Sequence, residues 1–284
     1  MNAGAGRPFT KMHGAGNDFV LLDCRGGAPL PDAALARALG DRHRGVGFDQ
    51  LLTIEDATQA GSLARYRIWN ADGSPAQQCG NGARCVAAWL VRDGAATTPT
   101  FRLDSPAGPI DVVRVGDDRY QLAMGLPEFA PERIPFAADA RRDEYTLATT
   151  AGEVRFGAVS MGNPHAVVFV DDVAATDLAT LGPAVQARPE FAEGVNVGIA
   201  QVLTPSRIRL RVFERGAGET LACGSGACAA VAVGIRQGRL EREVAVDLPG
   251  GTLLIRWPDD RTPLTMAGPV AFVFEGRLAE GLPC

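Results

Sequence analysis

The sequence predicts an α+β protein of two similar domains, each a mixed β-sheet or barrel wrapped around a central helix. Three observations favour this fold. The motif Cys79-Gly-Asn-Gly-Ala returns 144 residues later as Cys223-Gly-Ser-Gly-Ala. Each copy opens an apolar segment typical of a buried helix, and most of the remaining chain has the short alternating pattern typical of strands.

The repeat extends along both halves of the chain. Its landmarks occur in the same order at offsets of 144 to 146 residues, which indicates an internal duplication. The matched pairs are Asn17 with Asn163, Gln50 with Asn196, Asn70 with Glu214, and Gly94 with Gly238.

The helices are predicted first, over Ala83–Val91 and Ala227–Ile235, because both segments are almost wholly apolar. A helix that is hydrophobic all round must be buried, and Gly94 and Gly238 are expected to end the two helices. Arg207–Phe213 alternates strictly between apolar residues and arginines, which predicts a half-buried strand. Further strands are predicted at Phe101–Leu103, Ile110–Val115, Tyr120–Met124, Val154–Val159 and Ala166–Val170.

Composition narrows the class of protein. The 284 residues carry a net charge of −5 with no basic run, which argues against nucleic acid or an anionic membrane as a partner. The longest apolar runs are far shorter than the ~20 residues of a membrane span, and Met1–Pro8 lacks the apolar core of a secretory signal. We therefore expect a soluble, cytoplasmic protein.

The six cysteines do not suggest a disulfide scaffold in a chain of this length. Cys79 and Cys223 are expected at helix N-termini, where the macrodipole pushes a thiol toward thiolate. The first-turn N–H groups of both helices would bind a carboxylate between the two thiols. One thiolate could then remove an α-proton while the other thiol protonates the opposite face. The N–H groups belong to Gly80, Asn81, Gly224 and Ser225, and the remaining cysteines (Cys24, Cys85, Cys228 and Cys284) are interpreted as packing residues.

A set of polar residues fits an amino-acid ligand with additional polar groups. Arg215 could bind a second carboxylate and Glu214 could accept from an ammonium group. His165 could tune a thiol or relay a proton, or be purely structural. Asparagines in Gly-rich turns often serve only the backbone, but five amides at repeat-related positions favour binding. The amides are Asn17, Gln50, Asn70, Asn163 and Asn196.

These motifs resemble diaminopimelate epimerase over residues 9 to 276. The resemblance is carried by Lys11–Val20, Asn70–Ser74 with Gln78–Cys85, Gly162–His165, Gly194–Asn196 and Glu214–Cys228. It implies interconversion of LL- and meso-diaminopimelate, a precursor for lysine and peptidoglycan, by two cysteines. It also implies that no pyridoxal phosphate or other cofactor and no metal take part, and that the protein is a homodimer.

The resemblance also assigns roles by position. Cys79 and Cys223 would be the acid/base pair, with His165 and Glu214 adjusting their proton affinity. Gly80, Asn81, Gly224 and Ser225 would hold the reacting carboxylate. Asn17, Asn70, Asn163, Asn196 and Arg215, with Gln50 also in the site, would hold chiefly the distal centre of the substrate.

The last strand, within Ala267–Gly276, would return to the first domain. With the proline-rich stretch Pro127–Pro135 as the crossing, the predicted domains are residues 1–127 plus 264–284 and residues 128–263. Phe274 departs from the resembling proteins, which commonly have Tyr there near the dimer contact.

Three alternatives remain from the sequence. Proline racemases and related isomerases share the resemblance, although the amides and Arg215 suit a longer substrate. A dinucleotide-binding enzyme is suggested by Gly224-Ser-Gly-Ala-Cys-Ala229 with Asp247 about 20 residues on. A zinc or redox module could use Cys79 with Cys85 and Cys223 with Cys228, although both spacings miss the usual zinc pattern.

Overall fold

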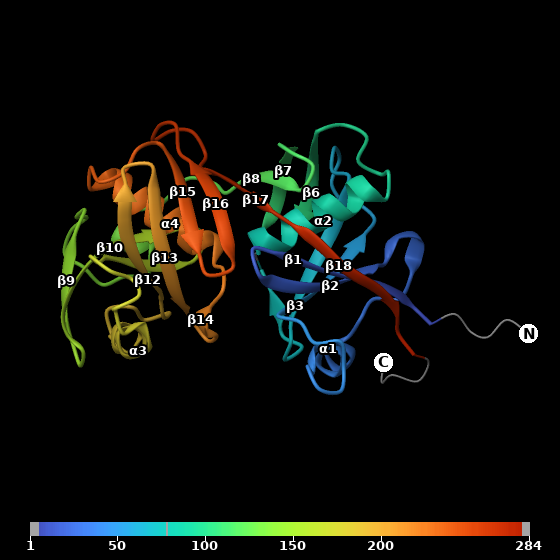
Figure 1. Cartoon of the computed structure of the whole chain (residues 1–284), viewed down its shortest axis with the longest axis horizontal. Coiled ribbons are helices and arrows are strands. Elements are labelled where there is room, and N and C mark those ends of the chain that lie inside the picture. Colours follow the sequence, from blue (N-terminus) through green and yellow to red (C-terminus); the bar gives the residue numbers. More distant parts are fainter. Residues whose placement is uncertain (1–5, 78, 280–284) are drawn as a thin grey trace, which may run out of the picture. The chain divides into compact units, whose positions relative to one another are not determined.

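The computed structural model describes residues 6–77 and 79–279, which form two compact units (Figure 1). The first unit holds the chain up to Leu122 and again from Gly268, and the second unit is Ala123–Ala267. The crossing between units thus lies just before the proline-rich stretch. The domain boundaries predicted at 127/128 and 263/264 stay a prediction, and Cys284 lies outside the described residues.

The first unit is built on one mixed sheet. Its neighbouring strands pair in the order β8, β7, β6, β4, β3, β2, β1, with β2–β3 and β4–β6 parallel and the other pairs antiparallel. The short strand β5 adds to β4. The bounds are β1 Pro8–Gly14, β2 Asn17–Asp23, β3 Gln50–Glu55, β4 Ala64–Asn70, β5 Pro75–Ala76, β6 Thr100–Ser105, β7 Gly108–Arg114 and β8 Arg119–Ala123.

The second unit repeats this pairing strand for strand. Its order is β17, β16, β15, β13, β12, β11, β10, again with the β11–β12 and β13–β15 pairs parallel, and β14 adds to β13 as β5 adds to β4. The bounds are β10 Gly152–Ser160, β11 Pro164–Phe169, β12 Asn196–Thr204, β13 Arg207–Glu214, β14 Gly218–Thr220, β15 Glu243–Leu248, β16 Gly251–Arg256 and β17 Thr265–Pro269. The shared topology agrees with the duplication inferred from sequence.

Each unit has one further strand at the equivalent edge. In the first unit β18 (Ala271–Arg277) pairs antiparallel with β1, so the prediction that the last strand returns to the first domain is confirmed. In the second unit β9 (Tyr145–Thr149) pairs antiparallel with β10.

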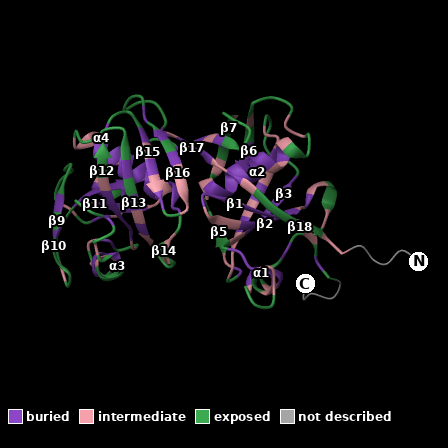
Figure 2. Ribbon diagram, in the orientation of Figure 1, coloured by how far each residue is buried: buried purple, intermediate pink, exposed green. Residues whose placement is uncertain are grey.

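The central helices are α2 (Gly80–Arg92) and α4 (Gly224–Arg236), and both are mostly buried (Figure 2). Helix α2 packs on β1, β2 and β3, and α4 packs on the matching β10, β11 and β12. Gly94 and Gly238 follow the two helices with φ of 83° and 69°, the left-handed conformation that ends a helix at low cost. The predicted α+β fold, with strands around one buried helix in each half, is confirmed.

Two more helices occupy matching places in the duplication. Helix α1 (Ala33–Gly40) lies between β2 and β3, and α3 (Leu178–Gln186) lies between β11 and β12. Single 3₁₀ turns occur at Arg25–Gly27 and Pro131–Arg133. Within the described chain, no helix has the length and apolar character needed to cross a membrane.

Candidate active site

Cys79 is the N-cap residue of α2 in the first unit. Its backbone is extended (φ −149°, ψ 102°) and its Sγ accepts a hydrogen bond from the N–H of Gly82 at 3.4 Å. The thiol also lies 3.6 Å from Oδ1 of Asn17, to which it donates. Gly80 and Asn81 form the first turn of α2, where N–H groups have no acceptor within the helix. The predicted position of Cys79 at a helix N-terminus is therefore confirmed.

Asn17 reaches Cys79 because a tight hairpin joins β1 to β2. The two turn residues, Ala15 and Gly16, have φ of 52° and 83°, as a two-residue turn of the type I′ kind requires. Asn17 follows directly, and its Nδ2 donates to Oδ2 of Asp49 at 2.8 Å. The Oδ1 of Asn17 also accepts from Nδ2 of Asn81 at 3.4 Å. Sequence reasoning identified both asparagines but missed Asp49.

Gln50 and Asn70 face each other across the β3–β4 pair. They are register partners, and Nε2 of Gln50 donates to Oδ1 of Asn70 at 3.0 Å. The amide nitrogen of Asn70 donates in turn to Oγ of Ser74 at 3.0 Å. The structure thus brings these two predicted residues together at the end of β4 that leads toward α2.

Cys223 occupies the matching N-cap position of α4 in the second unit. Its side chain is buried, and its Sγ lies 3.1 Å from Oε2 of Glu214 and 3.7 Å from Oγ of Ser225. Glu214 also accepts from the hydroxyl of Thr220. Glu214, Ser225 and Cys223 are thus brought together as predicted, and Thr220 was missed by sequence reasoning.

The surroundings of Cys223 favour its thiol over its thiolate. Burial raises the pKa of this thiol well above its usual range, and the charge and hydrogen bond of Glu214 raise it further, although Ser225 opposes them. The push that the helix N-terminus gives this thiol toward thiolate is therefore outweighed at Cys223. A dipole worth up to about 2 kcal/mol is outweighed by desolvation and a carboxylate at contact distance.

His165 is buried and neutral. Burial lowers the pKa of its imidazole to about 3, and the charge of Arg215 acts in the same direction. Nε2 of His165 lies 3.0 Å from Oδ1 of Asn163. Because an amide oxygen only accepts, the ring proton must lie on Nε2. His165 thus donates a hydrogen bond to Asn163, one of the residues predicted to bind the substrate.

Asn196 is buried opposite the end of β13 and bonds to backbone at both ends of its amide. Its Nδ2 donates to the carbonyl of Pro164 at 3.1 Å, and its Oδ1 accepts from the N–H of Arg215 at 3.0 Å. It pairs in register with His165, just as Gln50 pairs with Phe19 in the first unit.

Arg215 is exposed at the end of β13 and donates from Nη1 to the carbonyl of Glu193. Gly194 makes room for it, since a Cβ there would lie 2.8 Å from Cδ of Arg215 and the φ of 74° also favours glycine. The guanidinium is thereby fixed beside the β11–β12 end of the second unit, where the sequence predicted a carboxylate-binding role.

The predicted residues therefore form two sets, one in each unit. The first contains Asn17, Gln50, Asn70, Cys79, Gly80 and Asn81, and the second contains Asn163, His165, Asn196, Glu214, Arg215, Cys223, Gly224 and Ser225. Arg84 was missed in the first set: it is fully buried, and its Nη2 donates to Oδ1 of Asn81 at 2.7 Å. A charged residue inside an otherwise apolar helix was the signal that could have identified it.

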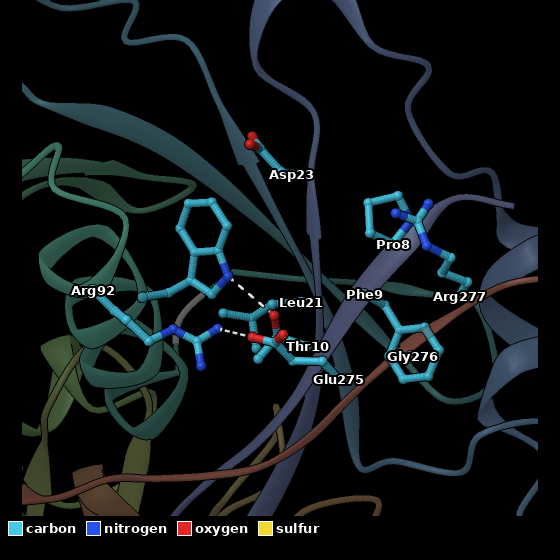
Figure 3. A pocket seen from close by; sticks show the side chains of 10 residues that line it. Pro8, Phe9, Thr10, Leu21, Asp23, Arg92, Glu275, Gly276 and Arg277 are labelled. Carbon is cyan, nitrogen blue, oxygen red and sulfur yellow. Dashed lines mark hydrogen bonds and ion pairs between the residues drawn. The ribbon is translucent and has the colours of Figure 1, made fainter. Parts of the chain in front are cut away.

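Other candidate sites do not coincide with these sets. A pocket of about 400 Å³ in the first unit lies among β1, β2, α2 and β18 and contains none of the predicted site residues (Figure 3). Among residues 6–77 and 79–279, no three His, Cys, Asp or Glu side chains gather in a way that could hold a metal ion. Asp247, invoked for a dinucleotide ribose, is bound by Arg207 at 2.7 Å and by Thr252 at 2.8 Å.

The sequence model of the family described as diaminopimelate epimerase matches residues 9–130 and 157–273. A diaminopimelate epimerase of Xanthomonas axonopodis pv. citri is 61% identical over 95% of this chain and 95% of its own length. One of Xylella fastidiosa (strain M12) is 56% identical over 94% and 95%.

Among solved structures, a hydroxyproline epimerase from Agrobacterium vitis covers 99% of this chain and 94% of its own, with a TM-score of 0.71. At 18% identity it shows the shared fold alone. Together with the confirmed fold, the match along both halves identifies the chain as a member of the diaminopimelate epimerase family.

Proposed function

We propose that the protein interconverts LL- and meso-diaminopimelate by proton transfer at one α-carbon, using Cys79 and Cys223. The observation that carries the proposal is the repeated N-cap cysteine, found in both units at the start of a buried helix. Relatives of 56–61% identity with this name support the substrate. One cysteine, as thiolate, takes the α-proton and becomes a thiol. The other thiol gives its proton to the opposite face, so the configuration inverts and the charges balance.

The helix starts supply the stabilisation that this reaction needs. Loss of the α-proton places negative charge on the substrate carboxylate, and first-turn N–H groups are donors already oriented toward such charge. We assign this role to Gly80, Asn81, Gly224 and Ser225. No cofactor or metal is required by the proposal, because the fixed donors replace the electron sink.

The two thiols are not equivalent in this scheme. Cys223 faces the carboxylate of Glu214, whereas Cys79 faces the neutral amide of Asn17. A thiolate beside a carboxylate is repelled more strongly than one beside an amide. We therefore propose that Cys223 is the acid and Cys79 the base in the first turnover, with Glu214 as the group that sets this order.

The remaining predicted residues are proposed to hold the rest of the substrate. Arg215 is suited to the distal carboxylate, since a guanidinium binds carboxylate through two parallel hydrogen bonds. The amides of Asn17, Gln50, Asn70, Asn163 and Asn196 are proposed to contact the distal polar groups. We assign neutral His165 to orienting Asn163 rather than to proton transfer.

The deciding experiment is deuterium exchange. LL-diaminopimelate incubated with the protein in D₂O, without added cofactor, should gain α-deuterium and convert to the meso form. Cys24→Ala, which alters a buried cysteine bonded to Arg7 away from the predicted site, should exchange normally. No exchange with diaminopimelate would contradict the proposal, and exchange with proline instead would identify the alternative isomerase.

We also propose that the protein is a homodimer in the cytoplasm. Strand β18 exposes three consecutive apolar residues, Phe272, Val273 and Phe274, of which 38%, 54% and 48% of the surface is exposed. A contiguous apolar edge of this kind is typical of an interface. Val273→Asp should give a monomer in sedimentation equilibrium, and an unchanged mass would argue against this edge.

The cytoplasm keeps thiols reduced, as the two-cysteine mechanism needs. Nucleic acid and membrane have no part in the proposal.

A further inference from the structure

Two side chains that sequence reasoning did not identify, Arg84 and Asp49, lie at opposite ends of one hydrogen-bonded chain through the first unit. Nη2 of Arg84 donates to Oδ1 of Asn81 at 2.7 Å. Nδ2 of Asn81 donates to Oδ1 of Asn17 at 3.4 Å, and Nδ2 of Asn17 donates to Oδ2 of Asp49 at 2.8 Å. The Cys79 thiol donates to the same Asn17 oxygen at 3.6 Å.

The two ends fix the direction of the whole chain. A guanidinium only donates and a carboxylate only accepts, whereas each asparagine amide presents a donor on one side and an acceptor on the other. Arg84 therefore requires the oxygen of Asn81, which leaves the Asn81 nitrogen to face Asn17. Asp49 requires the nitrogen of Asn17, so the Asn17 oxygen faces Cys79. Either end alone dictates the same arrangement.

Both ends are themselves held in place. Arg84 is fully buried in α2, and a Cβ on Gly14 of the facing strand would lie 3.4 Å from its Nη2. Asp49 accepts from the N–H of Asp18 at 3.1 Å and from Nη2 of Arg42 at 2.8 Å. The second unit does not repeat the device, because Cys228 and Val195 occupy the equivalent positions and Glu214 faces the thiol there.

We propose that Arg84 and Asp49 are positioning residues that jointly lock the Asn81 and Asn17 amides, so that a neutral acceptor oxygen always faces the Cys79 thiol. The lock raises the free energy of the Cys79 thiolate, because the sulfur then meets a carbonyl oxygen on its Asn17 side and a donor on its Gly82 side. This penalty is smaller than the one that the Glu214 carboxylate imposes on a Cys223 thiolate. Its significance for catalysis rests on the proposed epimerase function, but the lock itself does not.

The test is a double-mutant cycle on Cys79 alone. Arg84→Gln replaces a group that only donates, and Asp49→Asn replaces a group that only accepts, in each case by an amide that can do both. The double variant loses one positive and one negative charge, so the net charge is unchanged. In either single variant the opposite end still holds the direction, so only the small charge effect is expected. In the double variant both amides can turn, and a donor can face the thiolate. The pH midpoint for iodoacetamide labelling of the Cys79 peptide, read by mass spectrometry, should then fall by about one unit beyond the sum of the singles.

Two control variants separate the effect of amide orientation from the effect of the lost charges. Arg84→Lys with Asp49→Asn retains a donor-only end and should show no extra shift. Arg207→Gln with Asp247→Asn removes an ion pair in the second unit and should leave the midpoint unchanged. All variants keep the other titratable groups near the chain, which are Lys11, His13, Asp18, Arg42, Tyr66 and Cys85.

Shifts of the two singles that simply add would overturn the proposal. If the Arg84→Gln protein does not fold, neutron diffraction of the unaltered protein decides the same point, since deuterium on the Asn17 nitrogen facing Cys79 rather than Asp49 would refute the lock. Labelling needs no substrate. If the protein shows no epimerase activity but the double variant still shows the extra shift of the labelling midpoint, the proposed function is rejected and the lock is supported.

Discussion

Replacing Glu214 by Gln tests how the second unit holds a proton on Cys223. The two side chains touch at 3.1 Å between Oε2 and Sγ. At an effective dielectric constant of about 20, two unit charges at this distance repel by about 5 kcal/mol. Glu214 is half-buried, so solvent and Thr220 screen part of this charge. Even a remaining repulsion of about 2 kcal/mol changes the acid dissociation of the thiol more than tenfold.

Glu214→Gln should therefore lower the pKa of Cys223, since the anion is lost and the new amide can donate to a thiolate. The assay is the pH dependence of iodoacetamide labelling of the Cys223 peptide. The pH midpoint of labelling is compared, because the absolute rate also depends on how easily the reagent reaches the thiol. Glu219→Gln is the matched control, because Glu219 lies on the neighbouring strand β14 and pairs with Arg211 at 2.7 Å. An unchanged midpoint in Glu214→Gln would show that burial alone holds the proton, and the order of acid and base proposed above would lose its basis.

Three further outcomes are expected. Cys79→Ala and Cys223→Ala should each nearly abolish turnover of either stereoisomer, and full activity in either variant would remove that thiol from the acid/base pair. Gly157→Ala should destabilise the fold by about 1–3 kcal/mol in urea titrations, since its Cβ would lie 2.2 Å from Cγ1 of Val233 on α4, whereas Gly116→Ala, with 3.4 Å to its nearest neighbour, should cost less. Burial would raise the pKa of Asp18, but bonds from Arg42 and Lys11 lower it to about 2. The ionised Asp18 carboxylate therefore stabilises the fold above about pH 4, and this stabilisation is lost as the carboxylate is protonated toward pH 2. Asp18→Asn should therefore cost about 1–2 kcal/mol at pH 7, allowing for solvent screening, and flatten the acid limb of a stability–pH curve.

The sequence predicted the two buried helices and the repeat because both depend on local, periodic features. It missed α1 and α3 for different reasons. Helix α1 has an N-cap residue that is visible in the sequence, because Asp32 accepts a hydrogen bond from the N–H of Leu35. The helix is only eight residues long, however, which is too short for a clear periodic pattern. Helix α3 contains Pro183, a residue that usually marks the end of a helix.

The candidate site was predicted as far as residue identity allows. Repeat-related positions identified the cysteines and amides, but no pattern along the chain indicates which side chain faces which. Asp49 next to Asn17, and Arg84 beneath Asn81, follow from strand pairing and burial. For the same reason the sequence does not tell which thiol stays protonated, because the helix start at Cys223 is visible in the sequence whereas the burial of its thiol and its contact with Glu214 are not.

The pairing of β18 with β1 also sets the order in which the chain can be completed during synthesis. Strand β1 emerges from the ribosome first, but its partner comes from the last part of the chain, and the N–H of Leu278 closes the pair on the carbonyl of Arg7. The last strand of the second sheet, β17, ends at Pro269, so this sheet can be completed before β18 is made. The first unit is therefore completed after the second, and until β18 has been synthesised the edge of β1 that it covers stays open to pairing with other strands.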